Sequence, residues 1–316
     1  MVEVEYKELA EFGEAKPFVV VGVPAFNEEK TIARVVLEAQ KHADVVVVCN
    51  DGSSDLTQEI AERLGADVVR HEKNRGYGAA VKSLFQRARE LSADVLVTLD
   101  ADGQHTPQEI PKVIEPIVKG VADVVIGSRF IDAYGAAEMP KYRRLGARLI
   151  TKMVNGSAKN GVTDAQSGFR AYSRQAIEQL NPVEAGMGAS VEILIEASKH
   201  NLKISEVPST CKYQNSEAAT STEHPLAHGV GVVMSIIRLI VEEKPLLVLG
   251  APSLLFLFAG IGFGIWMLQI YAIEQRIVTN IALASLSFLI IGFFMLSTAI
   301  TLYAISRISK KMNGKR

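Results

Sequence analysis

Apolar runs alternate with amphipathic stretches through the first part of the chain. Five runs rich in Val, Leu and Ile have the length and β-branched content of buried strands, at residues 18–23, 45–49, 67–70, 94–99 and 124–127. Between them, apolar residues recur at helical spacing, at 31–41, 55–64, 77–90 and 107–119. This alternation predicts an α/β fold with a mostly parallel sheet and right-handed crossovers.

Each predicted strand is followed by a polar turn. The turns read PAFNEE (24–29), NDGSSD (50–55), NRGYG (74–78), DADGQH (100–105) and GSRF (127–130). In a parallel sheet, ligands bind beyond the carboxyl ends of the strands. We therefore expect these turns to form one site.

The turn after 94–99 carries the clearest chemistry. Asp100 and Asp102 stand at alternate positions, with Gln104 and His105 directly after them. Alternate positions at a strand end point the same way, so both carboxylates and Gln104 can converge on one point. Such oxygen ligands suit Mg²⁺ or Mn²⁺ with positions left open for substrate phosphates. A polar turn without a ligand is the alternative, and the neighbouring turns favour the metal.

Two long stretches near the C-terminus contain no charged residue, 246–271 and 277–306. Each exceeds the roughly 20 residues that cross a bilayer, so we predict a transmembrane hairpin with a short connection. The connection holds one arginine, whereas the tail is basic, with Arg307, Lys310, Lys311, Lys315 and Arg316. The positive-inside rule then predicts a cell-membrane protein with two spans, whose N-terminal domain is cytoplasmic.

Composition excludes several other classes. The 34 basic and 35 acidic residues nearly cancel, so no basic field favours nucleic acid as a partner. Cys49 and Cys211 lack metal-ligand spacing and are interpreted as reduced thiols. Gly76 and Gly78 could begin a dinucleotide fingerprint, but the third glycine is replaced by Val81, which disfavours a Rossmann oxidoreductase.

Two further motifs complete a recognisable order: DAQSGFR at 164–170 and EVP at 206–208. The ordered set resembles the family 2 inverting glycosyltransferases, and within them the dolichyl-phosphate mannose and glucose synthases, or polyprenyl-phosphate glycosyltransferases. The resemblance covers about 19–208. It implies a GT-A fold, meaning a Rossmann-like, mostly parallel catalytic domain, and a two-helix C-terminal anchor also occurs among relatives.

The resemblance also implies roles for individual residues. The donor nucleotide would be bound by Pro24, Phe26, Glu28, Asp51, Gly76 and Asp100. The metal would be held by Asp100, Asp102 and Gln104. The acceptor phosphate would be bound by Arg129, Arg143, Arg144, Ser167 and Arg170. The residues expected to carry catalysis are Asp102, Arg129 and Asp164.

The implied reaction moves a hexose, with inversion, from a nucleotide sugar to dolichyl or polyprenyl phosphate, for protein glycosylation or cell-envelope glycan assembly. The donor stays open among UDP-glucose, UDP-N-acetylglucosamine and GDP-mannose. A phosphate monoester is largely dianionic at neutral pH because its second pKa is about 6, so it needs little help from a base. Two alternatives remain: a glycosyltransferase that extends a glycan or polysaccharide, and a catalytically inactive membrane scaffold.

The predicted organisation has four parts: an N-terminal extension (1–17), the GT-A domain (18–225), an interfacial amphipathic helix (226–245), and the hairpin with its basic tail (246–316). The stretch 226–240 could instead be a core helix. The sequence leaves open whether hairpins pair in a homo-oligomer.

Overall fold

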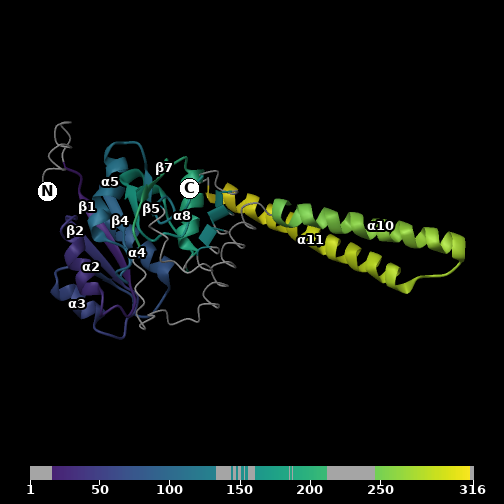
Figure 1. Ribbon diagram of the computed structural model, residues 1–316, viewed down its shortest axis with the longest axis horizontal. Coiled ribbons are helices and arrows are strands. Elements are labelled where there is room, and N and C mark those ends of the chain that lie inside the picture. Colours follow the sequence, from purple (N-terminus) through teal and green to yellow (C-terminus); the bar gives the residue numbers. More distant parts are fainter. Residues whose placement is uncertain are drawn as a thin grey trace. The chain divides into compact units, whose positions relative to one another are not determined.

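The computed structural model describes residues 16–132, 144, 147–148, 151–152, 154–155, 161–184, 186, 188–211 and 246–313. The chain divides into two compact units, Met1–Val233 and Met234–Arg316. The first is a layered α/β unit and the second is a helical hairpin (Figure 1).

A seven-stranded sheet forms the centre of the N-terminal unit, with the strand order β3-β2-β1-β4-β6-β5-β7. The strands are β1 (Val19–Ala25), β2 (Val45–Asn50), β3 (Asp67–Arg70), β4 (Val95–Thr98), β5 (Val124–Ser128), β6 (Arg170–Ser173) and β7 (Ile204–Pro208). Strand β6 runs antiparallel to β4 and β5, whereas the other pairs are parallel. The predicted mostly parallel α/β sheet is confirmed.

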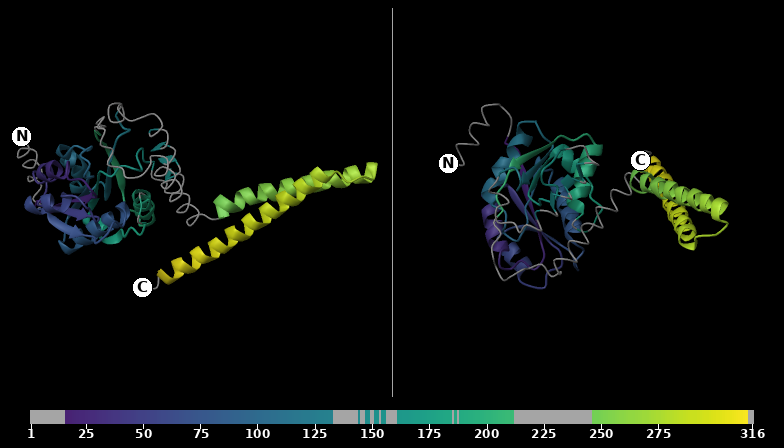
Figure 2. Two further views of the ribbon diagram at one scale, coloured as in Figure 1. Left: turned by 90° about the horizontal axis from the view of Figure 1, so that it is seen from below. Right: turned by 45° about the vertical axis from the view of Figure 1, so that its right-hand side comes forward.

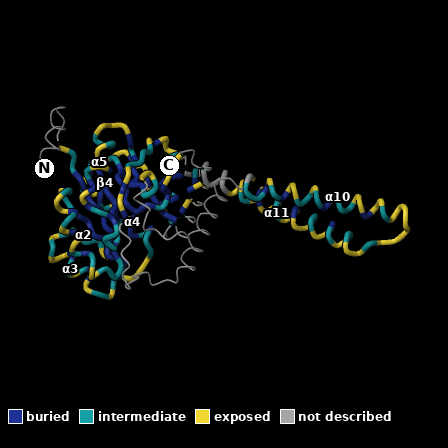
Figure 3. The backbone as a smooth tube through the Cα atoms, viewed as in Figure 1, coloured by how far each residue is buried: buried dark blue, intermediate teal, exposed yellow. Residues whose placement is uncertain are grey.

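Helices cover both faces of this sheet. Successive side chains of a strand point to opposite sides, so the apolar strands present an apolar surface on each face. On one face, Val19 and Val21 pack with α2 (Ile32–Ala39), α3 (Thr57–Arg63) and α5 (Ile110–Val118), which follows the short turn η2 (Pro107–Glu109). On the other face, Val20 and Leu96 pack with α4 (Tyr77–Glu90), α7 (Arg174–Gln179) and α8 (Ala189–Lys199). The buried residues therefore concentrate along the strands, between the two helical layers (Figures 2 and 3).

The hydrophobic pattern did not predict β7, α7 or α8, nor strand β6, which lies between β4 and β5 in the sheet. Strand β6 has four residues, Arg-Ala-Tyr-Ser, and begins with a charged side chain. Arg170 is nevertheless only 1% exposed, and its neighbour Tyr172 is buried as well. A short strand that begins with a buried arginine lacks the apolar run by which buried strands are recognised in a sequence.

The C-terminal unit contains two long helices that lie side by side (Figures 1 and 2). A π-helical turn, η3 (Leu246–Gly250), leads into α10 (Ala251–Glu274), and α11 (Thr279–Asn313) returns. The segments Val248–Glu274 and Thr279–Ile305 are both long and apolar enough to cross a membrane. Many large apolar side chains of the unit, such as Phe258 and Phe294, are exposed in it (Figure 3).

Close packing within the hairpin depends on small residues. The Ser285 hydroxyl donates to the Gly260 carbonyl at 2.8 Å. A Cβ on Gly260 would lie 2.9 Å from the backbone nitrogen of Leu289, so a side chain there would force the helices apart. The predicted interfacial helix at 226–245 and the domain boundary at residue 225 lie outside the described residues.

Candidate active site

The turns after β1, β2 and β4 emerge at one edge of the sheet. The parallel register pairs Ala25 with Asn50, so β1 and β2 end together, and it pairs Thr98 at the end of β4 with Gly22 of β1. The first two turns are interlocked: the Asn27 N–H donates to the Ser53 hydroxyl at 2.9 Å, and the Ser54 N–H donates to the Asn27 side chain at 2.9 Å. Pro24, Phe26 and Glu28 are half-buried along this edge. The predicted convergence of the turns is therefore present.

Asp100 and Asp102 form a pair of interacting, half-buried carboxylates directly after β4. Burial raises the pKa of Asp100 to about 7; the charge of Asp102 adds to this rise, and Arg129 and Arg170 oppose it. Burial also raises the pKa of Asp102. The N–H of Gln104 donates to that carboxylate at 2.9 Å and opposes the rise. The pKa of Glu28 is raised as well, first by burial and further by Asp102. Negative charge is thus concentrated at this point of the edge.

Gly168 fixes where the Asp100 carboxylate lies. A Cβ on Gly168 would be 2.7 Å from the Asp100 carboxyl carbon and closer still to both of its oxygens. The Gly168 carbonyl in turn accepts a hydrogen bond from the Thr98 hydroxyl at 2.8 Å. Glycine is required here because the loop before β6 passes against the carboxylate with no room for a side chain.

A hydrogen bond from α2 stabilises the turn that contains Asp102, Gly103 and Gln104. Gly103 has a φ of +69°, a left-handed conformation that glycine adopts without strain. Its carbonyl accepts from the Arg34 guanidinium at 3.1 Å. The Gln104 side chain accepts from the Cys211 thiol at 3.6 Å, so its amide oxygen faces the segment after β7.

Arg129 and Asp164 form a buried, two-pronged ion pair. The Arg129 Nε donates to Asp164 Oδ2 at 2.7 Å, and its Nη2 donates to Oδ1 at 2.9 Å. Burial alone would raise the pKa of Asp164, but the hydrogen bonds and charge of Arg129 outweigh it and hold that pKa below its usual range. The Arg129 side chain is 15% exposed and that of Asp164 is fully buried. Asp164 is therefore placed to orient Arg129.

Two residues predicted to bind the acceptor phosphate, Ser167 and Arg170, donate hydrogen bonds to backbone carbonyls around the site. The Arg170 guanidinium is buried and donates to three backbone carbonyls, those of Ala165, Ser167 and Ser190, at 2.7–2.8 Å. The Ser167 hydroxyl is fully buried and donates to the Gly127 carbonyl at 2.7 Å. Both side chains are buried and hydrogen-bonded to backbone carbonyls, so the acceptor role of Ser167 and Arg170 stays a prediction that this arrangement does not support. Arg170 holds the loop 165–167 in place and supplies positive charge behind Asp100.

Asp51, predicted to contact the nucleotide, is also buried. Its carboxylate accepts from the backbone N–H of Arg75 at 2.9 Å and of Gly76 at 2.8 Å. Gly76 immediately precedes α4 and has a φ of +95°. This geometry gives Asp51 a positioning role: it ties the NRG turn to the end of β2.

Of the predicted arginines, Arg143 lies outside the described residues, and Arg144 is a half-buried residue in helical conformation. Two residues that sequence reasoning left without a role also belong to the edge. The His105 ring is buried against Phe169, with 5.5 Å between ring centroids, and burial lowers its pKa to about 4. Glu109 accepts from the Ser209 hydroxyl and the Thr210 N–H, at 2.9 and 3.0 Å.

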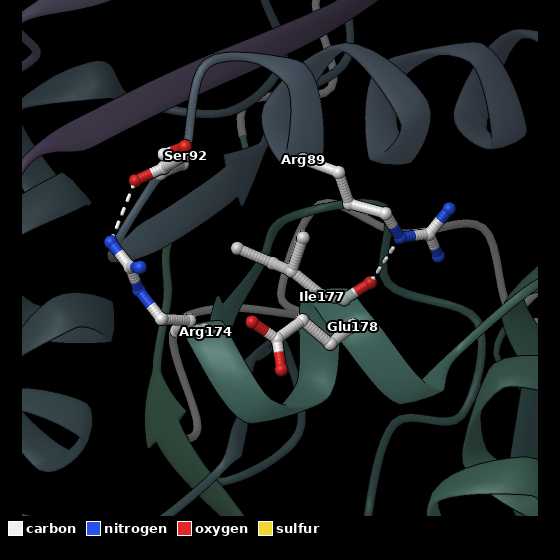
Figure 4. A pocket seen from close by; sticks show the side chains of 6 residues that line it. Arg89, Ser92, Arg174, Ile177 and Glu178 are labelled. Carbon is white, nitrogen blue, oxygen red and sulfur yellow. Dashed lines mark hydrogen bonds between the residues drawn. The ribbon is translucent and has the colours of Figure 1, made fainter.

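The pocket of about 200 Å³ in Figure 4 lies at the opposite edge of the sheet. Ser92 precedes β4 and Arg174 follows β6, whereas the aspartate pair follows β4 at its other end. Arg89 donates to the Ile177 carbonyl at 2.7 Å and Arg174 to the Ser92 carbonyl at 2.8 Å (Figure 4). Both guanidinium groups serve the fold there, away from the aspartate edge.

The aspartate edge carries oxygen ligands of the kind that divalent cations bind. Two carboxylates are ligands that Mg²⁺ and Mn²⁺ accept, and the raised pKa of Asp100 fits a site where a cation would supply positive charge. The Gln104 amide oxygen would have to turn from the Cys211 thiol to join them. Among the described residues, no cluster of three or more His, Cys, Asp or Glu side chains forms a complete site. A cation held by the two aspartates would need further ligands, such as water or a bound phosphate.

This sheet order, with a D-x-D turn after β4 at the carboxyl edge, defines the GT-A class of glycosyltransferase folds. Glycosyl transferase family 2 matches residues 20–180 of the chain. An uncharacterized protein of Methanocaldococcus jannaschii, MJ1222, is 36% identical over 239 residues, covering 73% of this chain and 94% of that protein. The chain belongs to glycosyl transferase family 2.

Two other similar proteins have named activities. The UDP-N-acetylglucosamine–dolichyl-phosphate N-acetylglucosaminyltransferase of Methanococcus voltae is 36% identical over 235 residues, covering 67% of this chain and 89% of that enzyme. The crystal structure of glucosyl-3-phosphoglycerate synthase from Mycobacterium tuberculosis with Mn²⁺, UDP and phosphoglyceric acid superposes with a TM-score of 0.55. It is 22% identical and covers 73% of this chain and 81% of that chain, a likeness of fold.

Replacing Gly168 by alanine tests whether this glycine places the Asp100 carboxylate. We expect Gly168→Ala to weaken Mn²⁺ binding by about tenfold or more, as loss of a group that orients a metal ligand does. Gly186→Ala is the control, because a Cβ there meets its nearest atom at an ordinary 3.6 Å. Calorimetric Mn²⁺ titration of both folded variants makes the comparison, and equal affinities would contradict the role of Gly168.

The raised pKa of Asp100 predicts how metal stabilisation depends on pH. A carboxyl whose pKa rises on folding, from 3.8 to about 7, favours the folded state at low pH and loses that contribution as pH rises through about 7. A divalent cation replaces the proton, so the rise in melting temperature caused by Mn²⁺ should be small at pH 5.5 and large at pH 8.

The measurement is thermal unfolding of the full chain in detergent, with Mn²⁺ or with a chelator. Asp100→Asn is the matched control, since its amide neither titrates nor carries the charge, and it should lose most of the difference between the two pH values. A metal shift that is the same at both pH values in the wild-type chain would refute the placement.

Proposed function

We propose that this protein transfers a hexose from a nucleotide sugar to dolichyl or polyprenyl phosphate, with inversion at the anomeric carbon. The observation that carries the proposal is the half-buried Asp100–Asp102 pair at the carboxyl edge, in a family 2 chain that ends in two apolar helices. The relative from Methanococcus voltae is named for transfer to dolichyl phosphate, which supports a lipid phosphate as the acceptor here. The product would feed protein glycosylation or cell-envelope glycan assembly.

In this proposal Asp100, Asp102 and Gln104 hold Mg²⁺ or Mn²⁺ against the donor diphosphate. When bound, the metal stabilises the negative charge that develops on the leaving nucleoside diphosphate. The protein's own contribution is to keep the two carboxylates together, through the close approach of Gly168 and the hydrogen bond from the Gln104 N–H. Arg170 lies behind Asp100 and lowers the cost of that crowding.

The donor nucleotide would lie along the turns after β1 and β2. Pro24, Phe26 and Glu28 line this part of the edge, and Gly76 is the last residue before α4. Glycine at this position lets backbone approach a ribose or a diphosphate closely. The donors to be compared are UDP-glucose, UDP-N-acetylglucosamine and GDP-mannose.

The acceptor phosphate would be met by Arg129, together with Arg144 and Arg143. Two hydrogen bonds to Asp164 fix the orientation of the Arg129 guanidinium. A planar guanidinium with five N–H groups can bind one carboxylate and still donate to a phosphate. Because the acceptor is already dianionic near neutral pH, one of its oxygens can attack the anomeric carbon without a dedicated base.

The hairpin gives this reaction its location. Two helices that can cross a bilayer would anchor the catalytic unit beside the membrane in which a polyprenyl chain dissolves. The basic residues after residue 306 support a topology in which the ends of the hairpin, and with them the catalytic unit, would lie on the cytoplasmic side.

A donor panel tests the reaction. Purified chain, Mn²⁺, a dolichyl or polyprenyl phosphate and each of the three nucleotide sugars should give a lipid-linked monosaccharide with at least one donor. Asp102→Ala should lower the rate by about 100-fold or more, the loss typical of removing one transition-state charge stabiliser. Glu59→Ala is the control, because Glu59 only pairs with Arg63 on the surface of α3.

A second variant in the same assay tests the acceptor side. Arg129→Lys keeps a positive charge beside Asp164 but loses the planar fork, so the KM for the lipid phosphate should rise more than the KM for the donor. Elongated glycans would indicate the polysaccharide-extending alternative. No glycolipid with any donor would indicate an inactive scaffold and overturn the proposal.

A further inference from the structure

A buried chain of polar side chains lies behind the NRG turn and has no part in the chemistry described above. His71, which directly follows β3, is 6% exposed. Its Nδ1 lies 2.6 Å from Asp51 Oδ1, and its Nε2 lies 2.9 Å from the Ser83 hydroxyl on α4. Three elements, the end of β2, the end of β3 and the first half of α4, therefore meet through one imidazole.

The partners define which way these hydrogen bonds run. An ionised carboxylate can only accept, so the His71 Nδ1–H donates to Asp51, and Nε2 can then accept from the Ser83 hydroxyl. Cys49 Sγ is also near, 3.8 Å from Nε2, but burial raises the pKa of its thiol to about 12. The sulfur therefore stays a neutral thiol and does not form a thiolate–imidazolium pair.

Asp51 passes this restraint on to the NRG turn. Besides His71, its carboxylate accepts the N–H groups of Arg75 and Gly76, which lead directly into α4. The backbone that leads into this turn packs closely against Gly52. A Cβ on Gly52 would lie 2.5 Å from the Lys73 carbonyl carbon and 2.6 Å from the Asn74 nitrogen. One carboxylate thus sets the position of two consecutive backbone N–H groups, and His71 fixes the rotation of that carboxylate.

We infer that His71 and Ser83 are positioning residues for the donor nucleotide: through Asp51 they hold the Arg75–Gly76 backbone where it contacts the ribose or diphosphate. The inference rests on the proposed function, because it takes the NRG turn as part of the donor site. Neither residue touches the substrate. Their removal should weaken nucleotide binding and leave the acceptor side, which lies around Arg129, unchanged.

The test is calorimetric titration of the full chain in detergent with UDP and with GDP, each in the presence of Mn²⁺. His71→Leu removes both hydrogen bonds at similar volume and should weaken binding of the nucleotide that the wild-type chain binds by about tenfold or more. His71→Asn should rescue much of this loss, because the asparagine amide nitrogen takes the place of Nδ1 and can still donate to Asp51. Ser83→Ala should cause a smaller loss than His71→Leu.

Two further readouts separate positioning from general stability. His42→Leu, at a half-buried histidine beyond the end of α2, is the matched control and should bind nucleotide as the wild-type chain does. In turnover, His71→Leu should raise the donor KM and leave the KM for the lipid phosphate unchanged.

The outcomes are distinct. Wild-type binding of a nucleotide with an unchanged His71→Leu affinity would overturn the inference and leave the proposed function standing. A His71→Leu loss that His71→Asn does not rescue, with both KM values and the melting temperature altered, would reduce His71 to a residue of the fold and also overturn it. A wild-type chain that binds neither UDP nor GDP would overturn the proposed function and the inference together.

Discussion

Repulsion between two carboxylates at the end of β4 is the constraint on which the rest of the catalytic edge depends. Burial, and then the charge of Asp102, raises the pKa of Asp100, and burial raises the pKa of Asp102 as well. The folded protein nevertheless keeps the two carboxyl groups side by side. Gly168 lies against the Asp100 carboxylate, where a side chain would displace that carboxylate. The positive charges of Arg129 and Arg170 oppose the rise in the pKa of Asp100 but do not cancel it.

Around that pair, the loops are held by other carboxylates that accept backbone N–H groups. Asp51 holds the turn before α4, Glu206 on β7 accepts the N–H groups of Thr163 and Asp164, and Glu109 holds the segment after β7. Each of these bonds joins segments far apart in the sequence. Charge-assisted bonds to backbone are stronger than neutral ones, so this arrangement gives loops at a ligand-binding edge the order that strands obtain from their ladders.

The sequence predicted the positions that periodicity and strand-end chemistry control. Residues 67–70 and the end of α4 at Glu90 agree with the structure, and the turns after β1, β2 and β4 converge as expected. Strand β6 escaped prediction because its first residue is an arginine, and a charged residue normally indicates the surface. The acceptor role of Arg170 and Ser167 came from the family resemblance and stays a prediction, and the structure turns both side chains into the protein. Only tertiary structure shows that three carbonyls already surround that guanidinium.

The His71–Asp51 contact was equally hidden, since the two residues follow different strands and nothing in their spacing links them. What a sequence can reveal is the chemical capacity of a turn. Which of its carboxylates face a ligand and which face the protein is decided by packing, as Asp51 and Asp100 demonstrate. Both follow a strand, yet Asp51 is fully engaged by backbone N–H groups and an imidazole, whereas Asp100 lies beside a second carboxylate.

The most direct measurement of the central claim is anomalous X-ray diffraction from crystals of the full chain grown with Mn²⁺ and a nucleoside diphosphate. The account predicts one strong manganese peak bridging the Asp100–Asp102 pair and the diphosphate, and no peak there in Asp100→Asn crystals. Manganese bound elsewhere, or a nucleotide bound at the edge with no metal between it and these two aspartates, would contradict it.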